Sequence, residues 1–284
     1  MTDIDQTKEI KFNKYSLPIG ERTCIMGVLN VTPDSFSDGG ECISVEKALE
    51  RALLLQEAGA DMIDVGGESS RPGAESVSVG EELERVIPVI RALKDKITVP
   101  ISIDTCKSEV AEKALEAGAS IVNDITALGS DKRMGKVVSK FNAGLILMHM
   151  KGDPGTMQDS PQYEDVVEEV FEHLLDAVSK AESAGVDPDK IIVDPGIGFG
   201  KTIDHNLKII NSLKRLKGLG KPILVGTSRK SFIGSVTGKE VSERAFGTAA
   251  SISAAIIKGA DIVRVHDVAE MRDVARVTDA IIGA

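Results

Sequence analysis

One structural unit recurs along the chain and limits the folds open to it. The unit is an amphipathic helix, a Gly-Ala turn, and a short β-branched run that ends in a polar residue; its clearest copies are residues 58–65 (AGADMIDV), 117–124 (AGASIVND) and 258–265 (KGADIVRV). Glycine supplies the left-handed conformation that ends a helix, and the continuous apolar run is typical of a strand buried on both faces. The chain is therefore predicted to be an α/β protein with a parallel sheet.

Eight such strands follow one another without interruption. They are predicted at residues 25–30, 61–65, 100–104, 120–124, 145–149, 191–194, 222–226 and 261–265. Each is followed by a helical pattern, and eight β-α units in series predict a TIM (β/α)8 barrel. A doubly wound open sheet also alternates strands and helices and is the structural alternative. Both folds bind ligands at the carboxyl ends of their strands.

The chain is expected to be a single domain over residues 1–284, because no low-complexity linker divides it. A barrel of this class takes about 250 residues. Residues 1–24 precede the repeat as an N-terminal extension, in which residues 10–19 resemble a short β-hairpin that could plug the barrel floor. Pro88, inside the apolar pattern of residues 83–93, is expected to kink that helix or restart it.

Composition excludes several classes of partner. Lys and Arg number 34 against 44 Asp and Glu, which gives a net charge of −10, and such a chain is not expected to bind nucleic acid or an anionic membrane. No apolar run approaches the roughly 18 residues of a membrane span. Three widely spaced cysteines (Cys24, Cys42 and Cys106), with no signal peptide before them, favour the reducing cytoplasm.

Polar side chains end nearly every predicted strand. They are Asn30, Asp64, Asp104, Asn123, Asp124, His149, Asp194, Lys230, Arg264 and His266. A single Asp after a strand is often a helix N-cap, and either histidine could be structural. Such a set at one barrel mouth instead indicates a ligand site. Residues 196–202 (GIGFGKT) end like a phosphate-binding loop, but Pro195 stands where that motif requires its first glycine, so no nucleotide site is predicted there.

Eight segments resemble signatures of the dihydropteroate synthase family, in the family's order. They are residues 30–40 (NVTPDSFSDGG), 64–74 (DVGGESSRPGA), 103–105 (IDT), 122–125 (VNDI), 148–150 (MHM), 194–201 (DPGIGFGK), 226–231 (GTSRKS) and 264–267 (RVHD), within a resemblance that runs from about residue 26 to the C-terminus. It implies a TIM barrel that joins p-aminobenzoate to 6-hydroxymethyl-7,8-dihydropterin diphosphate and releases 7,8-dihydropteroate and pyrophosphate. This is the step of folate biosynthesis that sulfonamides block.

The resemblance also implies a role for each site residue. The pterin would bind Asp104, Asn123, Met148, Asp194, Gly226, Lys230 and Arg264. The diphosphate would bind Asn30, Arg71 and His266, with Mg2+ held by Asn30, and p-aminobenzoate would bind Ser70, Pro72 and Phe199. The cationic groups Arg71, Lys230, Arg264 and His266 would be catalytic. Physically, a carboxylate can accept two parallel hydrogen bonds from the donor edge of a pterin, and a guanidinium can stack on its ring.

Some alternatives stay open at this point. Arg264 could instead pair with Asp261 or Asp267. Ser70 replaces the family's usual Thr, which predicts unchanged chemistry in a slightly roomier arylamine pocket. Other functions that fit are a methyltetrahydrofolate–corrinoid methyltransferase-like pterin-binding protein and a non-catalytic homologue. The family is commonly homodimeric, so a homodimer is expected.

Overall fold

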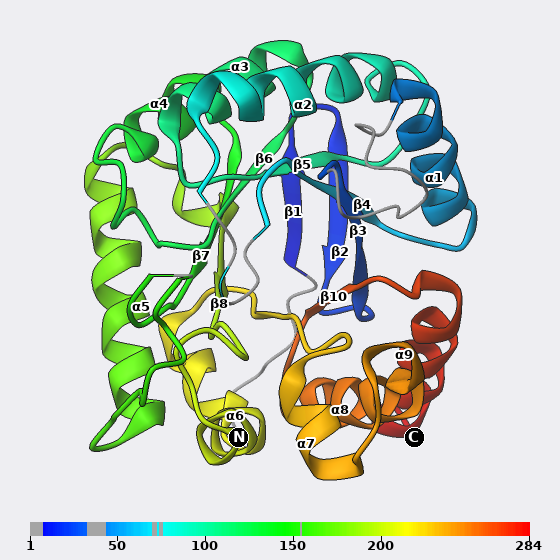
Figure 1. Ribbon diagram of the computed structural model, residues 1–284, viewed down its shortest axis with the longest axis vertical. Coiled ribbons are helices and arrows are strands. Elements are labelled where there is room, and N and C mark those ends of the chain that lie inside the picture. The colour runs from blue at the N-terminus through cyan, green and yellow to red at the C-terminus, as the bar shows by residue number, and fades with distance from the viewer. Residues whose placement is uncertain (1–7, 33–43, 70–72, 74–75, 154) are drawn as a thin grey trace.

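The strands form a nearly closed barrel (Figure 1). The computed structural model describes residues 8–32, 44–69, 73, 76–153 and 155–284. The parallel sheet has the order β8-β7-β6-β5-β4-β3-β10-β9. Its strands are β3 (Cys24–Asn30), β4 (Met62–Gly66), β5 (Ile101–Asp104), β6 (Ile121–Asp124), β7 (Gly144–Met148), β8 (Ile191–Asp194), β9 (Leu224–Val225) and β10 (Ile262–Val265).

A backbone contact between the two ends of this sheet closes the ring. The Val193 N–H of β8 donates to the Pro222 carbonyl over 3.0 Å, and Val193 and Ile223 form an isolated parallel bridge. The predicted TIM barrel is therefore confirmed, and the open doubly wound alternative is wrong. The predicted strand boundaries hold closely, except that β9 is shorter than its predicted range of 222–226.

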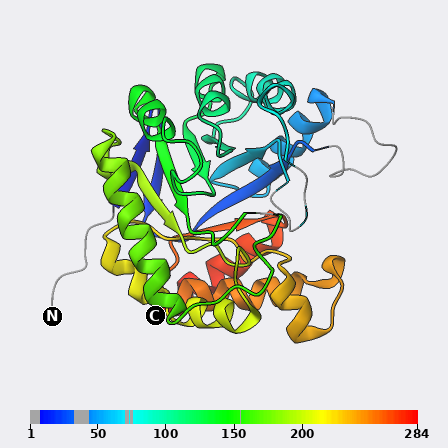
Figure 2. The same cartoon turned by 60° about the vertical axis from the view of Figure 1, so that its left-hand side comes forward.

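The helices lie outside the ring of strands (Figure 2). They are α1 (Val45–Glu57), α2 (Val79–Leu93), α3 (Ser108–Ala117), α4 (Met134–Phe141), α5 (Val166–Ser183), α6 (Ile203–Asn211), α7 (Ser231–Thr237), α8 (Ala245–Ile257) and α9 (Val268–Ile282), with short 3-10 turns η2 (Pro188–Lys190), η3 (Leu213–Leu219) and η4 (Val241–Glu243). None of the described helices is long and apolar enough to cross a membrane.

Two details test the sequence patterns behind these helices. The recurring glycine does take the left-handed conformation, with φ of 98° at Gly59 and 132° at Gly118. The expected restart at Pro88 is wrong, because α2 runs unbroken through it. Pro88 lies on the exposed face of the helix, where water can hydrate the Glu84 carbonyl that lacks its usual N–H donor.

An N-terminal hairpin plugs the floor of the barrel, as predicted. Its strands are β1 (Lys8–Phe12) and β2 (Tyr15–Ile19), paired antiparallel. The hairpin and the strand starts form one buried cluster. This cluster contains Ile10, Phe12, Leu17, Ile19, Cys24, Met26, Met62, Ile121, Ile146, Ile192, Leu224 and Ile262. The interior near the floor is therefore filled by apolar side chains, which leaves the opposite end of the strands for a ligand.

Phe12 tests the importance of this plug. Its side chain is fully buried, and a Cβ at Gly144 of β7 would lie 2.3 Å from Phe12 Cε1. We expect Phe12→Ala to lower the free energy of unfolding by about 3–5 kcal/mol, because it leaves a cavity in a filled layer. Urea denaturation measures this, with Lys11→Ala on the exposed side of the same strand as the control. A loss below about 1 kcal/mol would contradict the packing.

Candidate active site

The strand register brings four neighbouring positions to one level at the mouth of the barrel. Asn30 of β3 pairs with Gly66 of β4, Gly66 pairs with Asp104 of β5, and Asp104 pairs with Asn123 of β6. Gly66 has no side chain, and a Cβ built there would be in ordinary contact with its neighbours, 3.8 Å from both Asn30 Oδ1 and Asp104 Oδ2. The row therefore brings an amide and a carboxylate group close together on either side of Gly66.

Arg264 joins this row from the other side of β3. Its Nε donates to Asp64 Oδ2 over 2.7 Å, and its Nη2 donates to Asp104 Oδ2 over 2.8 Å. The alternative partners of Arg264 are excluded, since Asp261 pairs with Lys217 and Asp267 pairs with Arg229. Arg264 thus holds two carboxylates together in the centre of the mouth.

Asp64 also belongs to this network, although no ligand was assigned to it from the sequence. It is fully buried, and its Oδ2 also accepts a hydrogen bond of 3.1 Å from Asn123 Nδ2. Its Oδ1 has no hydrogen-bond partner among the described residues. The only sequence signal was its place near a strand end, and the function of Asp64 here is to orient Arg264 and Asn123.

Burial raises the pKa of two carboxyl groups at the mouth. Asp194, at the end of β8, accepts the Gly196 N–H over 2.7 Å, and burial raises the pKa of Asp194 to about 6. Burial, followed by the negative charge of Asp64, raises the pKa of Asp104 to about 7, against the effect of Arg264. Both groups would gain from an external partner that donates hydrogen bonds to them.

Phe199 and Lys230 lie together near Asp194. Lys230 Nζ lies 4.0 Å from the centroid of the Phe199 ring, and burial lowers the pKa of Lys230 to about 8. Phe199 packs in one cluster with Met148, which pairs with Asp194 across β7 and β8, and with Met157. Gly226 lies next to Arg264, whose Cβ would be 3.7 Å from a side chain there. These predicted pterin and arylamine residues therefore adjoin one another.

His266 lies close to Ser228 at the end of β10. The two residues are 3.0 Å apart, from His266 Nδ1 to Ser228 Oγ, and the His266 backbone N–H also donates to that Oγ. Burial, followed by the charge of Arg264, lowers the pKa of His266 to about 4. These surroundings favour the neutral form of the imidazole ring.

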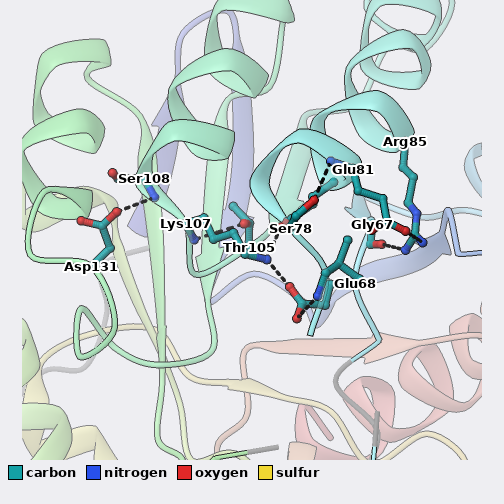
Figure 3. Close-up of polar contacts among 11 residues, drawn as sticks. Gly67, Glu68, Ser78, Glu81, Arg85, Thr105, Lys107, Ser108 and Asp131 are labelled. Atoms are coloured by element: carbon teal, nitrogen blue, oxygen red, sulfur yellow. Dashed lines mark hydrogen bonds and ion pairs between the residues drawn. The ribbon is translucent and has the colours of Figure 1, made fainter. Parts of the chain in front are cut away.

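Ser70, Arg71 and Pro72 lie outside the described residues, but the base of their loop is defined (Figure 3). Glu68 accepts the Val77 N–H over 3.2 Å and forms an ion pair with Lys107. Lys107 also pairs with the buried Glu82 over 2.6 Å. Glu68 thus joins the two sides of the loop. These contacts were not predicted from the sequence, where their only signal is an acidic residue, Glu82, on the buried face of α2.

A metal ion at the mouth would have few protein ligands among the described residues. In this part of the chain, no group of three or more His, Cys, Asp or Glu side chains could hold a metal ion. What the mouth offers is the Asn30 amide oxygen, which would lie 3.8 Å from a Cβ at Gly66. Mg2+ commonly takes one or two protein oxygens and completes its shell with water and substrate phosphates. The donor set therefore fits a magnesium ion shared with a phosphorylated ligand.

Comparison with known proteins agrees with this geometry. The family model for pterin binding enzymes matches residues 26–266. A dihydropteroate synthase of Clostridium beijerinckii is 48% identical over 96% of this chain and 99% of its own length. A Yersinia pestis dihydropteroate synthase solved with a sulfonamide drug complex has a TM-score of 0.93 and 39% identity, covering 97% of this chain and 100% of that one.

A third relative links the fold to a product. The Xanthomonas albilineans dihydropteroate synthase in complex with 7,8-dihydropteroate has a TM-score of 0.87 and 40% identity, covering 97% of this chain and 99% of that one. The family match and the similarity over nearly the full chain both point to the same family. The chain belongs to the dihydropteroate synthase family of pterin-binding enzymes.

Proposed function

We propose that the mouth of the barrel condenses 6-hydroxymethyl-7,8-dihydropterin diphosphate with p-aminobenzoate to give 7,8-dihydropteroate and pyrophosphate. The observation that carries this proposal is the network of Arg264 with Asp64 and Asp104, next to Asp194 and Lys230. These groups supply both hydrogen-bond donors and acceptors, which suits a heterocycle with both kinds of group on its edge.

Asp194 is proposed to bind the donor edge of the pterin. One oxygen of Asp194 is engaged by the Gly196 N–H, and the carboxylate can still accept from the 2-amino and N3 donors of the ring. Asp104 and Asn123 bind other polar atoms, and Lys230 donates to the carbonyl side. The Arg264 guanidinium, fixed by two carboxylates, offers a flat face on which the ring stacks.

The diphosphate is proposed to bind Asn30, Arg71 and His266. If the Ser228 hydroxyl donates to His266 Nδ1, the ring proton is on Nε2 and can be donated to a phosphate oxygen. Mg2+ is assigned to Asn30, and when bound it would neutralise charge on the departing diphosphate. Support for this assignment is the position of the Asn30 amide oxygen at a strand end, in the same row as Asp104.

The reaction is proposed to be a dissociative displacement at the pterin CH2 group. The electron-rich dihydropterin stabilises the developing cation, while Arg71 and His266 stabilise the negative charge that leaves. The arylamine is mostly neutral at pH 7, so no strong general base is needed. Ser70, Pro72 and Phe199 would hold p-aminobenzoate with its amine directed at the CH2 carbon, and Lys230 lies next to this pocket.

We also propose a cytoplasmic homodimer. The resemblance to the family is the first support for the dimer. The second is a set of exposed apolar side chains on α8 and α9, two helices that pack side by side. These side chains are Phe246, Ile257, Val277, Ile281 and Ile282, of which Phe246 is 90% exposed. Support for the cytoplasm is limited to the sequence, in which the three cysteines form no disulfide pattern.

Turnover tests the proposed function directly. The purified chain should convert dihydropterin diphosphate and p-aminobenzoate, with Mg2+, into equal amounts of dihydropteroate and pyrophosphate, measured by chromatography and a pyrophosphate assay. Removing the metal with a chelator should lower the rate. Absence of both products would contradict the proposal, and methyl transfer from methyltetrahydrofolate to a corrinoid would favour the alternative function.

Asp194→Asn tests the pterin subsite. The loss of a buried charge-assisted pair should weaken pterin binding by about 2–4 kcal/mol, measured by calorimetry. Asp204→Asn is the matched control, because Asp204 is an exposed residue of α6 that pairs with Lys208 on the surface. Equal pterin affinity in the Asp194 variant and the wild type would remove Asp194 from the site.

Arg71→Ala and His266→Ala test the diphosphate subsite. Each should weaken pyrophosphate binding more than the binding of a pterin without phosphates, because both side chains are assigned to phosphate oxygens. Competition titrations with each ligand measure the two affinities. Arg133→Ala, which removes an exposed arginine of the surface, should change neither. The opposite order of effects would mean that the two subsites are exchanged.

A further inference from the structure

One buried lysine has no role in the reaction described above. Lys201, in the turn between β8 and α6, is only 3% exposed. Its Nζ lies 2.9 Å from each of three acceptors, which are the carbonyl oxygens of Gly196 and Phe199 and the Nδ1 of His149. The His149 carbonyl oxygen is 3.3 Å away. An ammonium group has three protons, which matches the three shorter contacts.

His149 is a neutral partner in this arrangement. Burial, followed by the charge of Lys201, lowers the pKa of His149 to about 2. Burial also lowers the pKa of Lys201 to about 7, and the charge of Asp194 opposes that shift. Even a neutral amine keeps two N–H groups for the two turn carbonyls, while its lone pair accepts from His149 in the tautomer that carries its proton on Nδ1. The contacts of Lys201 with the turn therefore persist in both protonation states.

The turn that Lys201 holds lies directly on the chain that follows β7. Gly196 and Gly200 have φ of 66° and 62°. A Cβ at Gly196 would lie 1.9 Å from the His149 carbonyl oxygen, and one at Gly200 would lie 2.2 Å from the Lys151 carbonyl oxygen. A backbone pressed this closely against another needs its carbonyl groups satisfied from within, and Lys201 does so for two of them.

Both of these carbonyls belong to residues that border the substrate site. Gly196 donates its N–H to Asp194, and Phe199 carries the ring that lies 4.0 Å from Lys230 Nζ. A second donor, Gln158 Nε2, binds the Gly198 carbonyl between them over 2.6 Å. Lys201 therefore holds the turn at both ends.

We propose that Lys201 is a positioning residue for the arylamine substrate, because it fixes the 196–199 turn against the end of β7 and so sets the Phe199 ring opposite Lys230. This inference rests on the proposed function and assigns Lys201 no contact with either substrate. This role also explains the lysine of the GIGFGKT segment (residues 196–202), which lacks the first glycine of a nucleotide-binding loop.

Lys201→Met is the first test, since methionine fills a similar volume without the N–H donors. We expect the KM for p-aminobenzoate to rise about tenfold, while kcat and the KM for the pterin substrate change by less than about threefold. Lys208→Met is the matched control. It removes an exposed lysine of α6 that pairs with Asp204 on the surface, and it should leave both KM values unchanged.

A double-mutant cycle with Phe199→Leu separates positioning from general loss of structure. If Lys201 acts through the ring, adding Lys201→Met to Phe199→Leu should raise the KM for p-aminobenzoate by less than about twofold. Effects that multiply independently, or an equal rise in both KM values, would overturn the proposal. Pterin affinity and thermal unfolding of each variant show whether it is folded.

A milder variant covers the case in which Lys201→Met does not fold. Gln158→Met removes the exposed donor to the Gly198 carbonyl of the same turn, and it should raise the KM for p-aminobenzoate more than that for the pterin. No change in either value would overturn the proposal. Failure of the wild type to form dihydropteroate would instead reject the proposed function, so the two failures are distinguishable.

Discussion

The ion pair between Arg264 and Asp64 is the interaction on which the rest of the mouth depends. These residues are 200 positions apart in the sequence, and their strands, β10 and β4, lie on either side of β3. Two buried carboxylates at one place would repel each other, and the guanidinium makes the cluster tolerable. It also fixes the flat face of Arg264, so that stability and ligand recognition rest on the same contacts.

The barrel supplies this arrangement through register rather than through any single loop. Asn30, Gly66, Asp104 and Asn123 share one level because four neighbouring parallel strands are paired in that register. A shift of one residue in any pair would turn a polar side chain away from the mouth. The apolar floor and the helices outside hold the register, which leaves the side chains at the strand ends free to differ in chemistry.

Much of the fold and of the site could be predicted from the sequence. The periodicity of strands and helices is a local pattern, and the polar residues that end the strands can be identified directly in the sequence. The eight strands, the floor hairpin and the convergence of Asp104, Asn123, Asp194 and Arg264 are of this kind. The roles of Asp64 and Lys201 are not, because they depend on which distant groups a buried side chain meets. The lowered pKa of His266 likewise results from burial, which no local pattern encodes.

The hairpin at the floor has a consequence for the order in which the chain can fold. Its apolar side chains are synthesised first, yet their neighbours include Ile192, Leu224 and Ile262 from the second half of the chain. The ring also needs β10, near the C-terminus, to pair with β3. Until those strands leave the ribosome, Phe12 and its neighbours cannot be fully covered. The nascent chain therefore carries an exposed apolar hairpin for most of its synthesis, and this interval is when it is most open to aggregation or to a chaperone.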